Sequence, residues 1–277
     1  PIVTGGIVPI WWDNKKYDIE LTRAHLEEDA GKSTHNSSKN NSRVDFNRSG
    51  APLIEIVTEP VLTHPIQAKI FIQRIKQIVN YIAISNAEME QGKLRCDANI
   101  SLKKKGVKKF GTKTEIKNIN SFRNVQKAIE SEIKRQHYLL ENGKEVVQAS
   151  LTWNNEKNTA EIMRVKENAD DYRYFPDPDL PPVTISESKI DSIKQDLPIL
   201  PFEFENRWID KYDFKPDEAT TLASTIHIAS YFEEIIRYDV TPKNASKWIT
   251  GELFRLFNEI NIPVSYTHLT LPTTPYV

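Results

Sequence analysis

The residues that point most clearly to chemistry lie in two short stretches, 94–101 and 112–118. In each stretch, charged or amide side chains recur at every second position, which places them on one face of a β-strand. If the two strands pair, one face of the sheet brings these side chains within a few Å of one another. The polar positions of this face are Arg95, Asp97, Asn99, Ser101, Lys113, Glu115 and Lys117.

Such a face combines two kinds of group that prefer different ligands. Carboxylates such as those of Asp97 and Glu115 bind Mg²⁺, whereas Arg95 and Lys117 bind phosphoryl oxygens. The mixture therefore suits a divalent cation together with a phosphate. The solvated face of a half-exposed sheet would show the same alternation, and on spacing alone we favour this interpretation over a ligand site.

A second acidic group ends a strand expected over residues 17–28, which a turn joins to a strand over residues 2–12. Glu27 and Glu28 could coordinate a metal ion with His25 nearby. The alternative is a solvated acidic turn, with His25 as a hydrogen-bonded structural residue.

Residues 44–60 contain a strand over 53–58 in which Glu55 stands among apolar residues. A buried carboxylate without a partner is costly, so we expect Glu55 to pair with Arg48 or to face a ligand site. The preceding residues 35–43 are polar, and we expect a loop there with little structure of its own.

The remaining pattern predicts an α+β fold. A mainly antiparallel sheet forms a cradle with covering helices, and a truncated all-α domain follows it. Ser121 is a helix cap and Gly143 ends that helix. Residues 166–182 are acidic, aromatic and proline-rich, and we favour a core plug for their aromatic rings over a stacking platform. The other expected elements are helices over 66–83, 202–211, 216–236 and 242–259, strands over 146–155 and 161–165, and a linker over 185–201.

The composition restricts the class of protein. The formal net charge of the 277-residue chain is −1, so any RNA contact must come from local patches such as the basic run 103–109. One cysteine, Cys96, excludes an intrachain disulfide and a Cys-based zinc site. No stretch of about 18 apolar residues predicts a transmembrane helix, and no signal pattern starts the chain.

Five motifs, in this order, resemble the B subunits of the glutamyl-/aspartyl-tRNA amidotransferases, the GatB family. The resemblance covers about residues 1–262, and the number and order of the motifs make it specific. The motifs are HLEEDAGKSTH, VDFNRSGAPLIEIVTEP, EMEQGKLRCDANIS, TEIKNINSFRNVQKAIE and DYRYFPDPDLPP.

The resemblance implies a function. In this family, the GatB protein binds misacylated Glu-tRNA(Gln) or Asp-tRNA(Asn) and, with ATP and Mg²⁺, phosphorylates the side-chain carboxylate. Ammonia that the glutaminase, or A, subunit releases from glutamine then displaces the phosphate, while a small C subunit holds the other two together. We therefore expect an ATP-dependent carbon–nitrogen ligase of the cytoplasm, bacterial in type, with tRNA and no DNA or membrane as partner. The sequence does not distinguish a bacterial from an organellar form, or Glu-tRNA from Asp-tRNA.

The resemblance also implies roles for individual residues. Metal positions fall on Glu28, Asp97 and Glu115, with Glu27 and His25 beside them. Phosphate or substrate contacts fall on Arg95, Asn99 and Lys117, and ATP contacts on Arg95 and Lys117.

The chain departs from the family at both ends. The N-terminal strand that completes the metal shell and the C-terminal tail domain are missing, so we expect a fragment that is inactive alone. Residues 263–277 resemble a translated sequencing-adapter read-through. The expected organisation is a truncated cradle domain over 1–195, a partial helical domain over 196–262 and the artefact over 263–277.

Two other functions stay open. A non-catalytic tRNA-binding scaffold would keep the basic run 103–109 but need no metal face. An ATP-dependent ligase that acts on a small free carboxylic acid would need no RNA. Replacing Asp97 by asparagine separates the first alternative from the main expectation, and ATP turnover without tRNA separates the second.

Overall fold

The computed structural model describes residues 1–36, 41–165 and 184–260 of the chain. The fold is α+β, as expected, with mainly antiparallel sheets and helices. The chain divides into two compact units, residues 1–67 and 68–277, and each is described by itself. The expected features at residues 166–182 and 263–277 lie outside the described residues.

The first unit is built on the long strand β3 (Lys15–Glu28), which pairs with β1 (Val3–Thr4), β2 (Ile7–Trp12) and β6 (Pro52–Thr58). All these pairs are antiparallel. The hairpin between β2 and β3 turns at Asp13 and Asn14, whose φ values are +52° and +56°. Two consecutive residues with positive φ form the tight turn that matches strand twist. The single strand expected over residues 2–12 is interrupted between β1 and β2.

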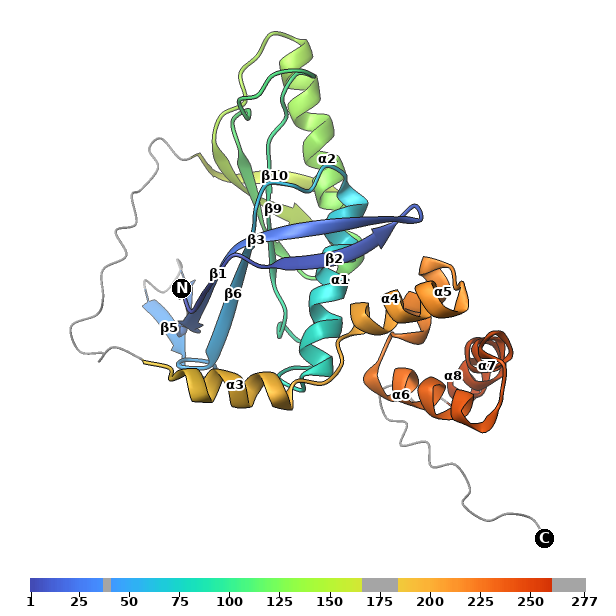
Figure 1. The fold of residues 1–277 in the computed structure, drawn as a ribbon. Coiled ribbons are helices and arrows are strands. Elements are labelled where there is room, and N and C mark those ends of the chain that lie inside the picture. The colour runs from blue at the N-terminus through green and yellow to red at the C-terminus, as the bar shows by residue number, and fades with distance from the viewer. Residues whose placement is uncertain (37–40, 166–183, 261–277) are drawn as a thin grey trace. The chain divides into compact units, whose positions relative to one another are not determined.

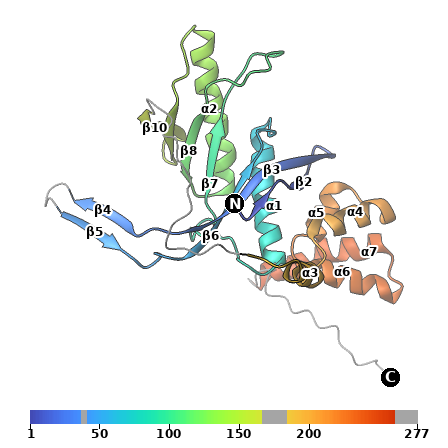
Figure 2. The ribbon, with the colours of Figure 1, turned by 60° about the vertical axis from the view of Figure 1, so that its left-hand side comes forward.

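Two expectations for this unit are wrong. The segment for which the sequence predicts a loop, residues 35–43, overlaps the antiparallel ribbon of β4 (Lys32–Asn36) and β5 (Asn41–Asp45), which Figure 2 shows beyond β6. The polar composition gives no sign of this hairpin, because residues 32–34 and 41–45 of the ribbon are all exposed. Glu55 does not pair with Arg48, which binds Asp29 at 2.9 Å; Glu55 instead lies opposite His25 at 3.5 Å.

The second unit contains the sheet of β7 (Cys96–Ile100), β8 (Thr114–Ile119), β9 (Ala149–Asn154) and β10 (Thr159–Val165), in the order β10-β9-β8-β7. The helix α2 (Phe122–Glu141) lies along this sheet (Figure 1), and its buried residues are Val125, Ala128, Glu132 and Gln136. Ser121 caps α2 by accepting a hydrogen bond from the backbone N–H of Asn124, and Gly143 follows its end with φ +67°. Since α2 joins β8 to β9, these two strands run parallel.

A bundle of helices forms the rest of the second unit around Trp208 and Phe232, both fully buried. The helix α1 (Pro65–Tyr81), in whose first turn the unit boundary falls, joins this core through Tyr81. The expected linker contains a helix, α3, and the helix expected over 216–236 is interrupted at residues 223–225. The elements around this core are α4 (Pro201–Tyr212), α5 (Pro216–Leu222), α6 (Ile226–Ile235), η1 (Ile236–Tyr238), α7 (Pro242–Trp248), the π-helical η2 (Ile249–Leu253) and α8 (Phe254–Glu259). The helix α3 (Glu187–Asp196) has only exposed residues and contributes none to the core.

Candidate functional site

The two strands singled out by their polar spacing are neighbours in the sheet. β7 and β8 pair antiparallel, and Asn99 lies directly opposite Glu115. On β7, the apolar residues Ala98 and Ile100 are buried, whereas Asp97 and Asn99 are exposed. The alternation therefore works as the sequence predicts, with the apolar residues toward α2 and the polar residues on the opposite face. We call this polar surface of β7 and β8 the carboxylate face.

Lys117 connects the two carboxylates of this face. Its Nζ lies 3.2 Å from Oδ2 of Asp97 and 3.3 Å from Oε1 of Glu115. The register between β7 and β8 shifts at this point, because Cys96 and Ala98 face Ile119 and Ile116, three residues apart. Bulges of this kind re-aim side chains. The extra residue thus lets one ammonium group contact carboxylates of two strands.

The charges of the face influence one another. Partial burial lowers the pKa of Lys117, but the charge of Asp97 and its hydrogen bond, helped by Glu115, outweigh burial and raise the pKa above its usual value. Lys117 therefore stays protonated at every pH at which the protein would work. The ion pairs that it makes contribute fully below the ordinary lysine pKa and are lost as the pH rises through the raised one.

Sequence reasoning missed one residue of the face, Ser150 on β9. Ser150 lies in register with Glu115, and its Oγ donates a hydrogen bond of 3.3 Å to Oε2 of that carboxylate. The strand was expected, but its parallel pairing with β8 was not. Ser150 and Thr152 are two residues apart on β9 and therefore lie on the same face of the strand. This spacing is the only sequence signal that could indicate a shared polar face.

A buried hydrogen-bond network supports the carboxylate face from the α2 side. The carboxylate of Glu132, fully buried, accepts hydrogen bonds from Oγ1 of Thr114 at 2.7 Å and from Nε2 of Gln136 at 2.8 Å. Gln136 also donates to the backbone carbonyl of Ile100 at 3.1 Å and accepts from the N–H of Leu102 at 3.0 Å. These contacts fix the last residue pair of β7 and β8, next to Asn99 and Glu115.

We expect Glu132→Gln to destabilise the protein in a pH-dependent way. Burial raises the pKa of Glu132, but hydrogen bonds from Arg135, Thr114 and Gln136 outweigh it and lower the pKa. A carboxylate with a lowered pKa stabilises the fold above its unfolded pKa of about 4.3. Near neutral pH the substitution should cost about 1–3 kcal/mol. The difference from wild type should shrink as the pH falls below about 4, measured by urea unfolding. A difference that stays constant with pH would contradict an ionised Glu132.

The remaining candidate metal residues lie in the first unit, at the end of β3. His25 accepts a hydrogen bond from Nε of Arg23 at 3.1 Å and is 3.5 Å from Glu55. Glu27 and Glu28 are both exposed. Because neighbouring strand residues point to opposite faces, β3 places His25 and Glu27 on one face and Glu28 on the other. The structure thus brings together Asp97, Glu115 and Lys117, but does not gather His25, Glu27 and Glu28 on one face.

Arg95 directly precedes β7 and is exposed. Among the described residues, no group of three or more His, Cys, Asp or Glu side chains is placed to hold a metal ion. Magnesium in nucleotide sites is commonly held by one or two carboxylates together with phosphates and water. Two converging carboxylates are therefore a sufficient protein contribution to such a site.

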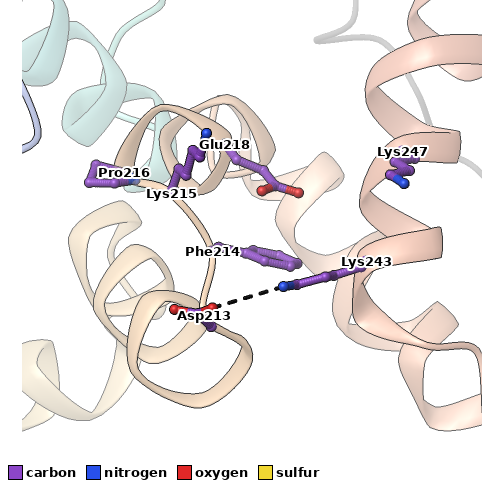
Figure 3. A pocket seen from close by; sticks show the side chains of 7 residues that line it. All are labelled: Asp213, Phe214, Lys215, Pro216, Glu218, Lys243 and Lys247. Carbon is purple, nitrogen blue, oxygen red and sulfur yellow. Dashed lines mark ion pairs between the residues drawn. The ribbon is translucent and has the colours of Figure 1, made fainter.

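The helical bundle contains a cavity of about 460 Å³ between α5 and α7 (Figure 3). Asp213 and Lys243 form an ion pair of 3.9 Å across it, and Glu218 accepts a hydrogen bond from Ser246. None of the predicted site residues lines this cavity. Its lining residues are Asp213, Phe214, Lys215, Pro216, Glu218, Lys243 and Lys247.

None of the described helices is long and apolar enough to cross a membrane.

The architecture defines an α+β domain whose sheet presents a carboxylate face opposite its covering helix. A model of the GatB/GatE catalytic domain matches residues 1–191. The chain therefore belongs to the GatB/GatE catalytic-domain family, and the resemblance expected from the five motifs is confirmed.

Curated relatives agree with this family. The B subunit of the aspartyl/glutamyl-tRNA(Asn/Gln) amidotransferase of Caldicellulosiruptor bescii is 45% identical over 94% of the chain and 54% of the relative. The proteins of the same name from Desulfotalea psychrophila and Coxiella burnetii are 46% and 45% identical, over 92% and 96% of the chain and 54% and 56% of each relative. The chain spans about half the length of the curated relatives it matches.

Proposed function

We propose that the chain is the activating part of the GatB protein of a tRNA-dependent amidotransferase, and that its carboxylate face serves the ATP-dependent step. The observation that carries the proposal is the convergence of Asp97 and Glu115 on Lys117 at 3.2 and 3.3 Å. Two carboxylates that already share one cation are placed to share another. Membership in the GatB/GatE family supports the reaction class.

The reaction needs activation of a carboxylate. At neutral pH a carboxylate does not react with ammonia, because its oxygen is a poor leaving group. Phosphorylation by ATP yields an acyl phosphate, whose phosphate ammonia can displace to give the amide. Phosphoryl transfer depends mainly on positioning and on neutralising charge. A face that combines carboxylates with Lys117 and Arg95 contains both kinds of group needed.

Asp97 and Glu115 fit a Mg²⁺ ion by the chemistry of their oxygen donors. Bound there, the ion would neutralise phosphate charge. A cation held by both carboxylates has to displace the ammonium group of Lys117. Lys117 would then be available to a phosphoryl oxygen, and the ordinary lysine pKa of about 10.4 keeps it charged near neutral pH. Ser150 orients the carboxylate of Glu115 through its hydrogen bond. Arg95 and Asn99 would contact the phosphates or the substrate.

The substrate in this proposal is misacylated Glu-tRNA(Gln) or Asp-tRNA(Asn), and the setting is translation in the cytoplasm. The A and C subunits would supply ammonia and hold the assembly together. The exposure of the face favours a macromolecular substrate: the side chains of Asp97 and Lys117 are 46% and 41% exposed. A ligase for a small free acid would be expected to enclose its substrate in a pocket.

Amide formation by the whole protein tests the proposal. A complete GatB protein that carries this core, assembled with its A and C partners, would be given Glu-tRNA(Gln), ATP, Mg²⁺ and ammonium in place of glutamine. We expect tRNA-dependent ADP release and Gln-tRNA(Gln). ADP release with free glutamate and no tRNA would indicate the small-acid ligase. Tight tRNA binding with no role for the carboxylate face in amidation would indicate the scaffold.

A further inference from the structure

The connection between β7 and β8 carries a concentrated positive charge. Residues 101–114 contain six lysines and no acidic residue, although the whole chain has 37 basic and 38 acidic residues. All six lysines are exposed. We call residues 103–113 the lysine loop; its lysines are Lys103, Lys104, Lys105, Lys108, Lys109 and Lys113.

The charge of the lysine loop is not neutralised within the described part of the chain. None of its lysines forms an ion pair there, whereas the exposed Lys157 and Lys194 each have an acidic partner nearby on the chain. Lys103 instead lies 4.5 Å from the ring centre of Phe110. Uncompensated exposed positive charge of this density attracts polyanions.

The lysine loop has a defined base. A Cβ on Gly111 would lie 2.0 Å from the carbonyl oxygen of Leu102, so only glycine allows the two ends of the loop to approach this closely. The N–H of Leu102 is held by Gln136 of α2 at 3.0 Å. Within the loop, the N–H of Val107 donates to the carbonyl of Lys104 at 3.1 Å. The lysines are therefore presented from a closed turn anchored on α2.

The loop also adjoins the carboxylate face. Ile100 and Thr114 form the last residue pair of β7 and β8, and the next pair is Asn99 with Glu115. One strand residue spans about 3.3 Å. The base of the loop therefore lies within a few residues of the carboxylate face, within reach of the groups that precede the end of a chain molecule bound there.

We propose that the lysine loop binds the phosphates of the single-stranded 3′ end of the RNA substrate, with Phe110 as a stacking surface for a base. The inference rests on the proposed function, which brings the aminoacylated 3′ end to the carboxylate face. Single-stranded RNA is bound by positive groups that follow its backbone and by aromatic rings on which bases stack. Phe110 is 54% exposed amid the lysines, with Nζ of Lys103 4.5 Å from the centre of its ring, and it meets the second requirement.

The salt dependence of RNA binding tests the inference. A labelled single-stranded RNA with an acceptor-end sequence would be titrated with the 277-residue chain, and its anisotropy measured at several salt concentrations. Neutralising three loop lysines should flatten the slope of log K against log salt by about 2, because each phosphate contact on a single strand contributes about 0.7. A variant that loses three exposed lysines of α2 and α3 should keep the wild-type slope. The loop variant is Lys104→Gln/Lys105→Gln/Lys108→Gln, and the control is Lys134→Gln/Lys189→Gln/Lys194→Gln.

A loop variant with the affinity and slope of the control would overturn the inference. If that variant instead lost binding to an acidic peptide, the loop would be a protein-docking element. Circular dichroism of both variants shows whether they fold. This RNA-binding assay does not depend on amidation. If the complete protein needs the loop for RNA binding but forms no amide, the proposed function is refuted and the inference about the loop still holds. If the proposed function and the inference about the lysine loop are both correct, the loop variant of the complete protein should have a higher KM for tRNA and an unchanged kcat.

Discussion

Replacing Asp97 by asparagine is expected to lower the rate of amide formation by about 10²–10³-fold, the usual cost of removing one group that stabilises transition-state charge. Asparagine keeps the size of the side chain but removes the charge that Lys117 contacts at 3.2 Å. Because Asp97 is half exposed, the substitution should leave the fold intact. The effect should appear in kcat with ammonium as nitrogen donor, with RNA affinity unchanged.

The matched control for this variant is Glu156→Gln. Glu156 is an exposed acidic residue of the turn between β9 and β10 in the same sheet, and its carboxylate lies outside the carboxylate face. It should keep wild-type kcat and KM. Equal activity of the Asp97→Asn and Glu156→Gln variants would remove Asp97 from the site and direct attention to Glu27 and Glu28.

The largest expected effect on stability comes from Glu205→Ala. Arg74 of α1 and Glu205 of α4 form a bidentate ion pair, with both N–O distances at 2.7 Å, and their side chains are 3% and 0% exposed. Within the described part of the chain, removing Glu205 leaves the buried guanidinium with the amide oxygen of Gln77 as its remaining acceptor. Breaking a buried pair from one side costs about 3–5 kcal/mol, which chemical denaturation of the chain would measure.

The double variant Arg74→Met/Glu205→Leu distinguishes the loss of an interaction from the cost of an unpaired charge. Apolar residues of similar volume can replace a buried pair with little loss, so the double variant should recover most of the stability. If the single variant does not fold but the double variant does, the same conclusion holds. A single variant within about 1 kcal/mol of wild type would show that Arg74 finds another partner or water.

The sequence could predict what depends on local periodicity. The alternation around Asp97 and Asn99 reports directly which face of β7 is buried, and the α2 cap at Ser121 follows from side-chain chemistry close in sequence. Sequence reasoning misses the ribbon of β4 and β5 because its residues 32–34 and 41–45 are all exposed and show no apolar alternation. The helix α3 was missed for a related reason, since all its residues are exposed.

The details of the site depend on contacts between distant segments. The bulge that aims Lys117 at Asp97 arises from pairing of β8 with β7, and the contact of Ser150 with Glu115 arises from a parallel pairing across α2. Periodicity within one segment carries no information about either. The predicted partner of Glu55 is wrong for the same reason. Arg48 is near Glu55 in the sequence, whereas His25 lies opposite Glu55 across the sheet.

Metal binding tests the central claim most directly. In a complete GatB protein that carries this core, Mn²⁺ in place of Mg²⁺ would be titrated by electron paramagnetic resonance in the presence of a non-hydrolysable ATP analogue. The carboxylate face predicts a nucleotide-dependent Mn²⁺ site whose affinity falls about tenfold or more in Asp97→Asn and in Glu115→Gln, and not in Glu156→Gln. The same Mn²⁺ affinity in wild type and all three variants would contradict the claim that this face holds the metal.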